Sequence, residues 1–262
     1  SPSSSARSAA HKSSSSLMRL KANTLRRWWP TLCLLHSEHR LAKDIRNLKK
    51  NPLHDNGIYY EHDEENMLHG RAMIIGPTNT PYQYGFYLFK IEFTNNYPAE
   101  PPKLIYCTQG NNIRFHPNLY RSGKVCVSIL NTWKGEQWSS CQTISTILLT
   151  IATLLDDKPL LNEPGITENH YDFHKFNEII TYSNFNFSII DLFLNIDEKY
   201  KDFSCFKDQI KNSLKDNYKE IEKLIKEYKE KEANIKLVKT NLYNLNCEIN
   251  YTQLAKNFKK IK

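Results

Sequence analysis

Residues 115–128 read FHPNLYRSGKVCVS, and this stretch places an amide, Asn118, and a thiol, Cys126, on either side of a short loop that contains Gly123. A thiol that accepts and passes on an acyl group must be exposed, must reach the thiolate form, and needs a hydrogen-bond donor near the oxyanion that forms. Cys126 and Asn118 have these two chemistries, and a Trp-Ser pair follows at Trp138. The stretch therefore predicts an acyl-transfer site on Cys126.

Further motifs stand in order on both sides of this stretch. They read IGPTNTPY at 75–82, GFYLF at 85–89, YPAEPPK at 97–103, WS at 138–139 and NEPG at 162–165. Together with the His-Pro-Asn and Cys pattern, they resemble the ubiquitin-conjugating enzyme family. The long loop between Cys126 and Trp138 looks like that of its Z-type branch, although Tyr84 stands where the family usually has Gly. Because several ordered motifs agree over roughly residues 34 to 165, the resemblance is more specific than a single match.

The resemblance implies an α+β fold, the ubiquitin-conjugating (UBC) fold, and the residue pattern agrees with it. Apolar residues at helical spacing predict an N-terminal helix over 34–50 that ends at Asn51-Pro52. Extended segments bounded by Gly, Pro or Asn predict a four-stranded antiparallel meander. They lie at about 58–61, 68–75, 84–93 and 103–106. A helix over about 143–155 is expected to cover the sheet, with the reactive loop between sheet and helix.

Three regions are expected along the chain. Residues 1–30 are Ser-rich and basic, which predicts a disordered tail, with an organellar transit segment as the alternative. Residues 31–165 form the conjugating core, and residues 166–262 a helical C-terminal extension. In the extension, short helices are predicted at 173–181 and 187–196, and a long one from 201 to about 236. The heptad-like stripe of the long helix allows a coiled coil, but packing against the core is favoured.

Composition limits the partners. The net charge of +8 is concentrated near the N-terminus, so a solvated tail is favoured over a nucleic-acid contact. The longest apolar runs, such as 147–155, are too short to span a bilayer, so no membrane partner is expected.

Neither a metal nor a cofactor is expected. The six cysteines form no C-x-x-C pair and no zinc pattern with the nine histidines, and they are interpreted as reduced intracellular thiols. No P-loop motif is present, so any ATP dependence belongs to the activating enzyme. A cytoplasmic or nuclear location is expected.

The resemblance implies a role for each residue near the thiol. Cys126 would accept ubiquitin or a ubiquitin-like modifier from an activating enzyme as a thioester, and would yield it to a lysine of a protein substrate or to a ligase cysteine. Asn118 would donate its amide either to the oxyanion or to the backbone of the loop, and both roles stay open. His116 and Pro117 would brace the loop, so a protease-like Cys-His dyad is disfavoured.

Two polar residues are candidates at the mouth of the site. Ser128 stands where many relatives carry Asp. Glu163 aligns with the family's gate residue and would supply a carboxylate that orients the incoming lysine. The alternative, a plain surface glutamate, stays open.

Partner surfaces follow from the same resemblance. The basic face of the N-terminal helix, with Arg40, Lys43 and Arg46, would dock the acidic surface of the activating enzyme, although a merely solvated face is the alternative. Ala99 replaces an aromatic ligase anchor, and Ser140 with Cys141 replaces the usual Pro-Ala. Binding to a generic panel of RING and HECT ligases is therefore expected to be weak.

Two rival functions remain: an inactive variant that serves as a binding module, and a structural or nucleic-acid-associated adaptor built on the basic tail and the long helix. The intact spacing of Asn118 and Cys126 argues against the first. The second predicts that the core motifs are dispensable.

Overall fold

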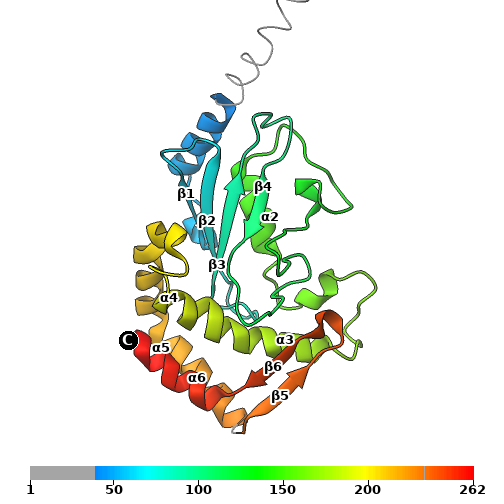
Figure 1. Cartoon of the computed structure of the whole chain (residues 1–262), viewed down its shortest axis with the longest axis vertical. Helices are drawn as coiled ribbons and strands as arrows, with labels where there is room; N and C mark the ends of the chain where they lie inside the picture. Colours follow the sequence, from blue (N-terminus) through cyan, green and yellow to red (C-terminus); the bar gives the residue numbers. More distant parts are fainter. Residues whose placement is uncertain (1–38, 233) are drawn as a thin grey trace, which may run out of the picture.

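The structure is a computed structural model that describes residues 39–232 and 234–262 (Figure 1). The predicted tail over 1–30 and the first residues of the predicted N-terminal helix lie outside this part. Residues 39–50 are helical. Leu41, Ile45 and Leu48 are 1%, 8% and 5% exposed, so the predicted apolar stripe of this helix is buried in the core.

The central sheet is the predicted antiparallel meander. Strands β1 (Ile58–His62), β2 (His69–Ile75), β3 (Phe86–Glu92) and β4 (Lys103–Tyr106) pair in chain order. In β3 four consecutive residues, from Phe86 to Phe89, are fully buried. Successive side chains of a strand point to opposite faces, so both faces of β3 are covered.

Helix α2 (Ile144–Thr153) lies against the sheet in Figure 1. It begins where the sequence predicts, because Thr143 and Thr146 form a reciprocal capping box that satisfies two backbone N–H groups. Ile144, Ile147 and Leu148 form part of its buried face. The prediction of a covering helix is confirmed.

The start of the extension differs from the prediction. Helix α3 (Phe173–Ser183) continues through the π-helical segment η4 (Asn184–Asp191) into α4 (Leu192–Leu194), so the prediction of two separate short helices is wrong. No Gly or Pro interrupts residues 182–186, and Asn184 is used in a tertiary contact. Its Oδ1 accepts from the Tyr87 hydroxyl at 2.6 Å, and its Nδ2 donates to the Gln83 carbonyl at 2.9 Å.

The rest of the extension is mostly helical, as predicted, and it also contains a short β-hairpin that the sequence analysis did not predict. The 3₁₀ segment η5 (Lys201–Phe206) precedes helix α5 (Lys207–Lys231), which ends before residue 236. Strands β5 (Lys236–Lys239) and β6 (Asn246–Ile249) then form an antiparallel hairpin, followed by α6 (Tyr251–Phe258). Burial alternates along β6, as expected for a strand with one buried face.

Helix α5 packs within its own chain. It contacts α6. Ser213 and Asn217 of α5 also line a surface hollow together with Gly57 and Leu149 of the core. The buried side chains Ile210, Leu214 and Ile221 of α5 belong to the same hydrophobic cluster as the core, so the buried stripe of α5 is used inside the chain rather than in a coiled coil.

Core and extension share one hydrophobic cluster. Close approaches support this: a Cβ on Gly110 would lie 2.1 Å from the Phe187 ring, so only Gly allows η4 to pack there. Tyr84, at the position where Gly is usual, has a φ of 63°, which explains why that position favours Gly.

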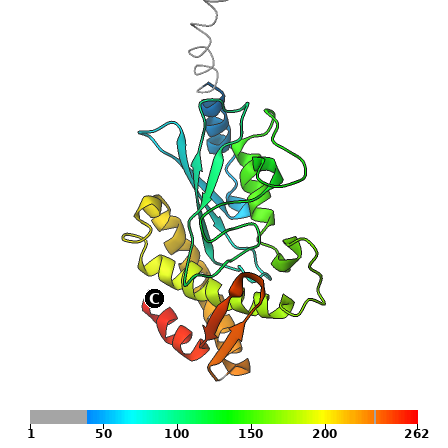
Figure 2. The ribbon, with the colours of Figure 1, turned by 45° about the vertical axis from the view of Figure 1, so that its right-hand side comes forward.

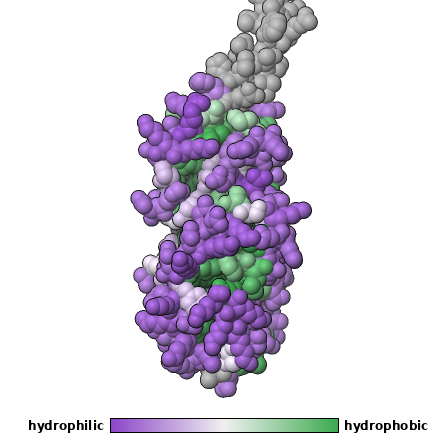
Figure 3. Space-filling view, turned by 90° about the vertical axis from the view of Figure 1, so that its left-hand side faces the viewer, coloured by the Kyte–Doolittle hydropathy of each residue, from purple (hydrophilic) through white to green (hydrophobic). Residues whose placement is uncertain are grey.

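On the face shown in Figure 3, polar side chains dominate and apolar side chains lie in the hollows between them. Among the described helices, none has the length and apolarity that crossing a membrane requires.

Candidate active site

Asn118 and Cys126 are brought together by reciprocal hydrogen bonds. The Cys126 N–H donates to the Asn118 carbonyl at 2.9 Å, and the Asn118 side-chain Nδ2 donates to the Cys126 carbonyl at 2.5 Å. An isolated β-bridge between Leu119 and Val125 closes the loop just inside this pair. In this structure the amide of Asn118 therefore braces the loop, which is one of the two roles that the sequence left open.

The Cys126 thiol is less accessible than the sequence predicts. Cys126 is 2% exposed, and its neighbours Val125 and Val127 are 2% and 5% exposed. The Thr132 hydroxyl lies between them: it accepts from the Val127 N–H at 2.9 Å and lies 3.0 Å from the Val125 carbonyl, to which it can donate. This side chain ties the thiol-bearing segment to the loop that follows it. The expectation of an exposed sulfur is wrong for this conformation, and the role of Thr132 was not found from the sequence.

His116 is a neutral structural residue. It is fully buried, and its Nδ1 accepts from the Asn118 N–H at 3.0 Å, which places the ring proton on Nε2. Burial, with a smaller contribution from the charge of Arg114, lowers the pKa of His116 to about 3. A neutral imidazole whose Nδ1 is already engaged is not a general base for the thiol. The carbonyl of Pro117 accepts from the Arg114 guanidinium, so both His116 and Pro117 hold the backbone of this segment in the structure.

Ser128 begins the short 3₁₀ turn η2 (Ser128–Leu130), directly after the thiol-bearing segment. Its carbonyl accepts from the Asn131 N–H at 2.8 Å, and Asn131 takes a left-handed conformation. A Cβ on Gly135 would lie 3.1 Å from the Ser128 Cβ, so the long loop folds back onto Ser128. Ser128 is therefore positioned at the base of this loop.

Glu163 contacts the C-terminal extension. Its carboxylate accepts a hydrogen bond from the Tyr243 hydroxyl, which comes from the turn between β5 and β6. Tyr243 also packs on Arg114, and Arg121 donates to its carbonyl. These three residues were missed by the sequence analysis. Glu163 and Tyr243 are separated by 80 positions in the sequence, so no local sequence pattern indicates that they are in contact.

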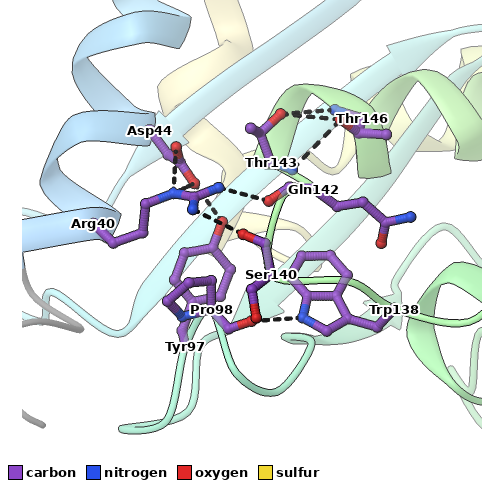
Figure 4. Close-up of polar contacts among 9 residues, drawn as sticks. All are labelled: Arg40, Asp44, Tyr97, Pro98, Trp138, Ser140, Gln142, Thr143 and Thr146. Atoms are coloured by element: carbon purple, nitrogen blue, oxygen red, sulfur yellow. Dashed lines mark hydrogen bonds and ion pairs between the residues drawn. The ribbon is translucent and has the colours of Figure 1, made fainter.

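Arg40 points into the molecule, as Figure 4 shows. Its Nε lies 3.1 Å from the buried carboxylate of Asp44, and its Nη1 and Nη2 donate to the carbonyls of Ser140 and Gln142, each at 2.8 Å. The Tyr97 hydroxyl donates to Asp44 at 2.5 Å. Arg40 thus ties the N-terminal helix to the Ser140 loop, which corrects its predicted place on the docking face. Lys43 and Arg46 are exposed and remain candidates for that face.

The two predicted ligase positions lie on neighbouring loops. The Trp138 Nε1 donates to the Pro98 carbonyl at 2.8 Å, which joins the turn that carries Ala99 to the loop that carries Ser140 (Figure 4). Ala99 and Ser140 are both exposed. The structure therefore brings these two positions onto one part of the surface.

No metal site is evident in residues 39–232 and 234–262, since these residues hold no cluster of three or more His, Cys, Asp or Glu side chains suited to a metal ion.

Comparison with known proteins gives a consistent result. Residues 40–181 match the family described as ubiquitin-conjugating enzyme. The chain is 38% identical over 186 residues to ubiquitin-conjugating enzyme E2 Z of Homo sapiens, which covers 65% of this chain and 51% of that protein. It is 35% identical over 176 residues to probable ubiquitin-conjugating enzyme protein 17 of Caenorhabditis elegans, covering 62% and 24%.

A third relative is the dual E2 ubiquitin-conjugating enzyme/E3 ubiquitin-protein ligase BIRC6 of Homo sapiens, 40% identical over 135 residues, covering 48% of this chain and 3% of that protein. The chain thus spans about half the length of the E2 Z relatives that it matches. The similarity to the Z-type branch, predicted from the motifs, is confirmed.

Proposed function

The chain belongs to the ubiquitin-conjugating enzyme family, and we propose that it carries ubiquitin or a ubiquitin-like modifier as a thioester on Cys126. The modifier would come from an activating enzyme and go to a substrate lysine or to a ligase cysteine. The observation that carries the proposal is the reciprocal pairing of Cys126 with Asn118, because it fixes the predicted nucleophile and the predicted amide donor in one braced loop.

Two acyl transfers make up the proposed reaction. In charging, the Cys126 thiolate attacks the thioester carbonyl on the activating enzyme, a new C–S bond forms, and the activating enzyme's thiolate leaves. In discharge, a lysine amine attacks the carbonyl on Cys126, a C–N bond forms, the C–S bond breaks, and the amine loses a proton. Neutral His116 is not available as the base, so we assign orientation of the lysine to Glu163.

Charging requires access to the thiol. Because Cys126 is 2% exposed, we propose that the loop after Val127 moves when the activating enzyme or the modifier binds. This movement would break the hydrogen bond between the Thr132 hydroxyl and the Val127 N–H. Residues 131–137 are all exposed, so the loop can move with little loss of buried apolar contact.

Partner surfaces are assigned as follows. Lys43 and Arg46 would face the activating enzyme, and the surface with Ala99 and Ser140 would face ligases. Because the first of these ligase positions lacks an aromatic anchor, we propose a narrow choice of ligases. A cytoplasmic or nuclear setting fits partners of this kind.

The test is a charging assay with the full chain, activating enzyme, ATP and ubiquitin, read on a non-reducing gel. Wild type should form an adduct that reductant removes. Cys126→Ser should lose it and form, more slowly, a reductant-resistant ester, because a hydroxyl is a weaker nucleophile. Cys141→Ser, at an exposed cysteine, is the matched control and should charge normally. Charging of Cys126→Ser at Cys141 would contradict the assignment, and no charging of wild type with any activating enzyme would favour the inactive binding module.

A further inference from the structure

The turn between β5 and β6 reaches the catalytic loop from the far end of the sequence. The Arg121 Nη2 donates to the Tyr243 carbonyl at 2.6 Å. The Arg114 guanidinium lies 3.8 Å from the ring centroid of Tyr120 and 4.2 Å from that of Tyr243. Tyr243 therefore contacts both ends of segment 114–121, which contains Asn118. In Figures 1 and 2 the β5–β6 hairpin lies beside the loops at this end of the core.

A third contact of Tyr243 reaches Glu163. The Tyr243 hydroxyl donates to the Glu163 carboxylate. Burial, followed by this hydrogen bond, raises the pKa of Tyr243, so the hydroxyl keeps its proton and stays a donor. A hydrogen bond to an ionised acceptor is stronger than one between neutral groups, so it restricts the orientation of the carboxylate.

The turn that presents Tyr243 is itself held firmly. Asp172, which is fully buried at the start of α3, accepts the N–H groups of Asn241 at 3.0 Å and of Leu242 at 2.9 Å. Tyr243 and the next residue, Asn244, have φ values of 60° and 49°. Side chains with a Cβ rarely adopt this left-handed conformation, so the contacts around the turn maintain it.

We propose that Tyr243 is a positioning residue of the active site, and that the extension takes part in discharge through it. Its hydroxyl fixes the orientation of the Glu163 carboxylate, to which we assign the orientation of the lysine, and its ring and carbonyl support segment 114–121 from outside. This proposal rests on the proposed function. Discharge to lysine should depend on Tyr243 more than charging does, because the activating enzyme itself organises the first transfer.

The experiment compares Tyr243→Phe with wild type in single-turnover assays on the full chain. The variant keeps the ring over Arg114 and removes only the hydroxyl. The rate constant for discharge to free lysine should fall about tenfold to a hundredfold, as for the loss of one hydrogen bond to a charged group, while charging stays within about twofold. Tyr218→Phe is the matched control, since that ring stacks on Phe258 and its hydroxyl has no partner among the described residues.

A double-mutant cycle tests whether the hydroxyl acts through Glu163. Glu163→Ala alone should slow discharge, and adding Tyr243→Phe to it should slow discharge no further. A purely structural contribution of the hydroxyl would instead add to the effect of Glu163→Ala. Discharge of Tyr243→Phe is also measured as a function of lysine concentration. If the incoming lysine is oriented poorly, the maximal rate falls or the half-saturating lysine concentration rises, while the melting temperature stays unchanged.

The proposal is overturned if Tyr243→Phe discharges at the wild-type rate, or if it loses charging and discharge equally. Additive effects of the two substitutions in the double-mutant cycle would overturn it as well. Failure of wild type to charge would instead refute the proposed function, so the two failures are distinct. If Tyr243→Ala is also made and proves unstable, Tyr243→Phe still decides the question.

Discussion

Replacing Asn118 by Ala separates the two roles of this residue. In the structure its Nδ2 donates to the Cys126 carbonyl at 2.5 Å, while its Oδ1 is buried with no partner among the described residues. Asn118 and Cys126 are 9% and 2% exposed, so water does not easily replace the lost donor. The variant should therefore lose loop stability as well as activity.

The size of the effect follows from this geometry. Leaving the Cys126 carbonyl unsatisfied costs about 1–3 kcal/mol, and removing the unpartnered Oδ1 offsets part of that cost, so about 1–2 kcal/mol is expected. In a chain of this size, each 1 kcal/mol lowers Tm by about 2–4 °C, so the expected decrease is about 2–8 °C. A residue that served the oxyanion alone would instead give about a hundredfold slower discharge with an unchanged Tm.

The assay combines thermal unfolding with single-turnover charging and discharge. Asn118→Asp is a matched variant, because its side chain has the same shape but donates to the Cys126 carbonyl only when protonated. Facing a carbonyl raises the folded-state pKa of this Asp, so its stability should approach that of wild type as the pH falls and be lost as the pH rises through that pKa. An Asn118→Ala protein with the wild-type Tm would refute the bracing role.

Three further predictions follow from the packing. Burial lowers the pKa of His116 to about 3, so as the pH falls the unfolded chain takes up a proton on this side chain before the folded protein does. The free energy of unfolding should therefore fall by about 1.4 kcal/mol per pH unit between pH 6.5 and 3. His116→Asn should flatten this dependence in denaturation measured as a function of pH, and an unchanged slope would contradict the prediction. Iodoacetamide should label the exposed Cys141 well before Cys126, as peptide mass spectrometry would show, whereas equal rates would mean that the catalytic loop opens readily. Deleting 166–262 should abolish cooperative unfolding and charging, because it exposes the face of the core that packs against Asn184; a truncated protein that melts cooperatively and charges normally would refute this.

Most of the core could be predicted from local patterns. The four strands, their meander order and the start of α2 follow from alternation, turn residues and the Thr143 cap, all of which act within a few residues. The proximity of Asn118 and Cys126 likewise follows from their short separation around a Gly-containing turn. The division at residue 165 stays a prediction, since packing is continuous across it.

The extension was harder to predict, for physical reasons. Residues 246–249 carry the alternation of a short strand, but four residues at this period give a weak signal beside a long helical stripe. Nothing local ends α3, so its continuation through η4 depends on Asn184 contacting Tyr87 and Gln83.

By itself the sequence determined the candidate reactive groups of this protein: a thiol and an amide at a fixed spacing in a loop between a sheet and a helix. Only the tertiary structure decided how that chemistry is enclosed. In the folded chain Arg40 donates to the Ser140 carbonyl, and the Thr132 hydroxyl binds the backbone next to the buried Cys126. The Tyr243 hydroxyl donates to the Glu163 carboxylate. These contacts join residues far apart in the chain, and such pairs form only when the packed core brings their elements together, so no local pattern encodes them.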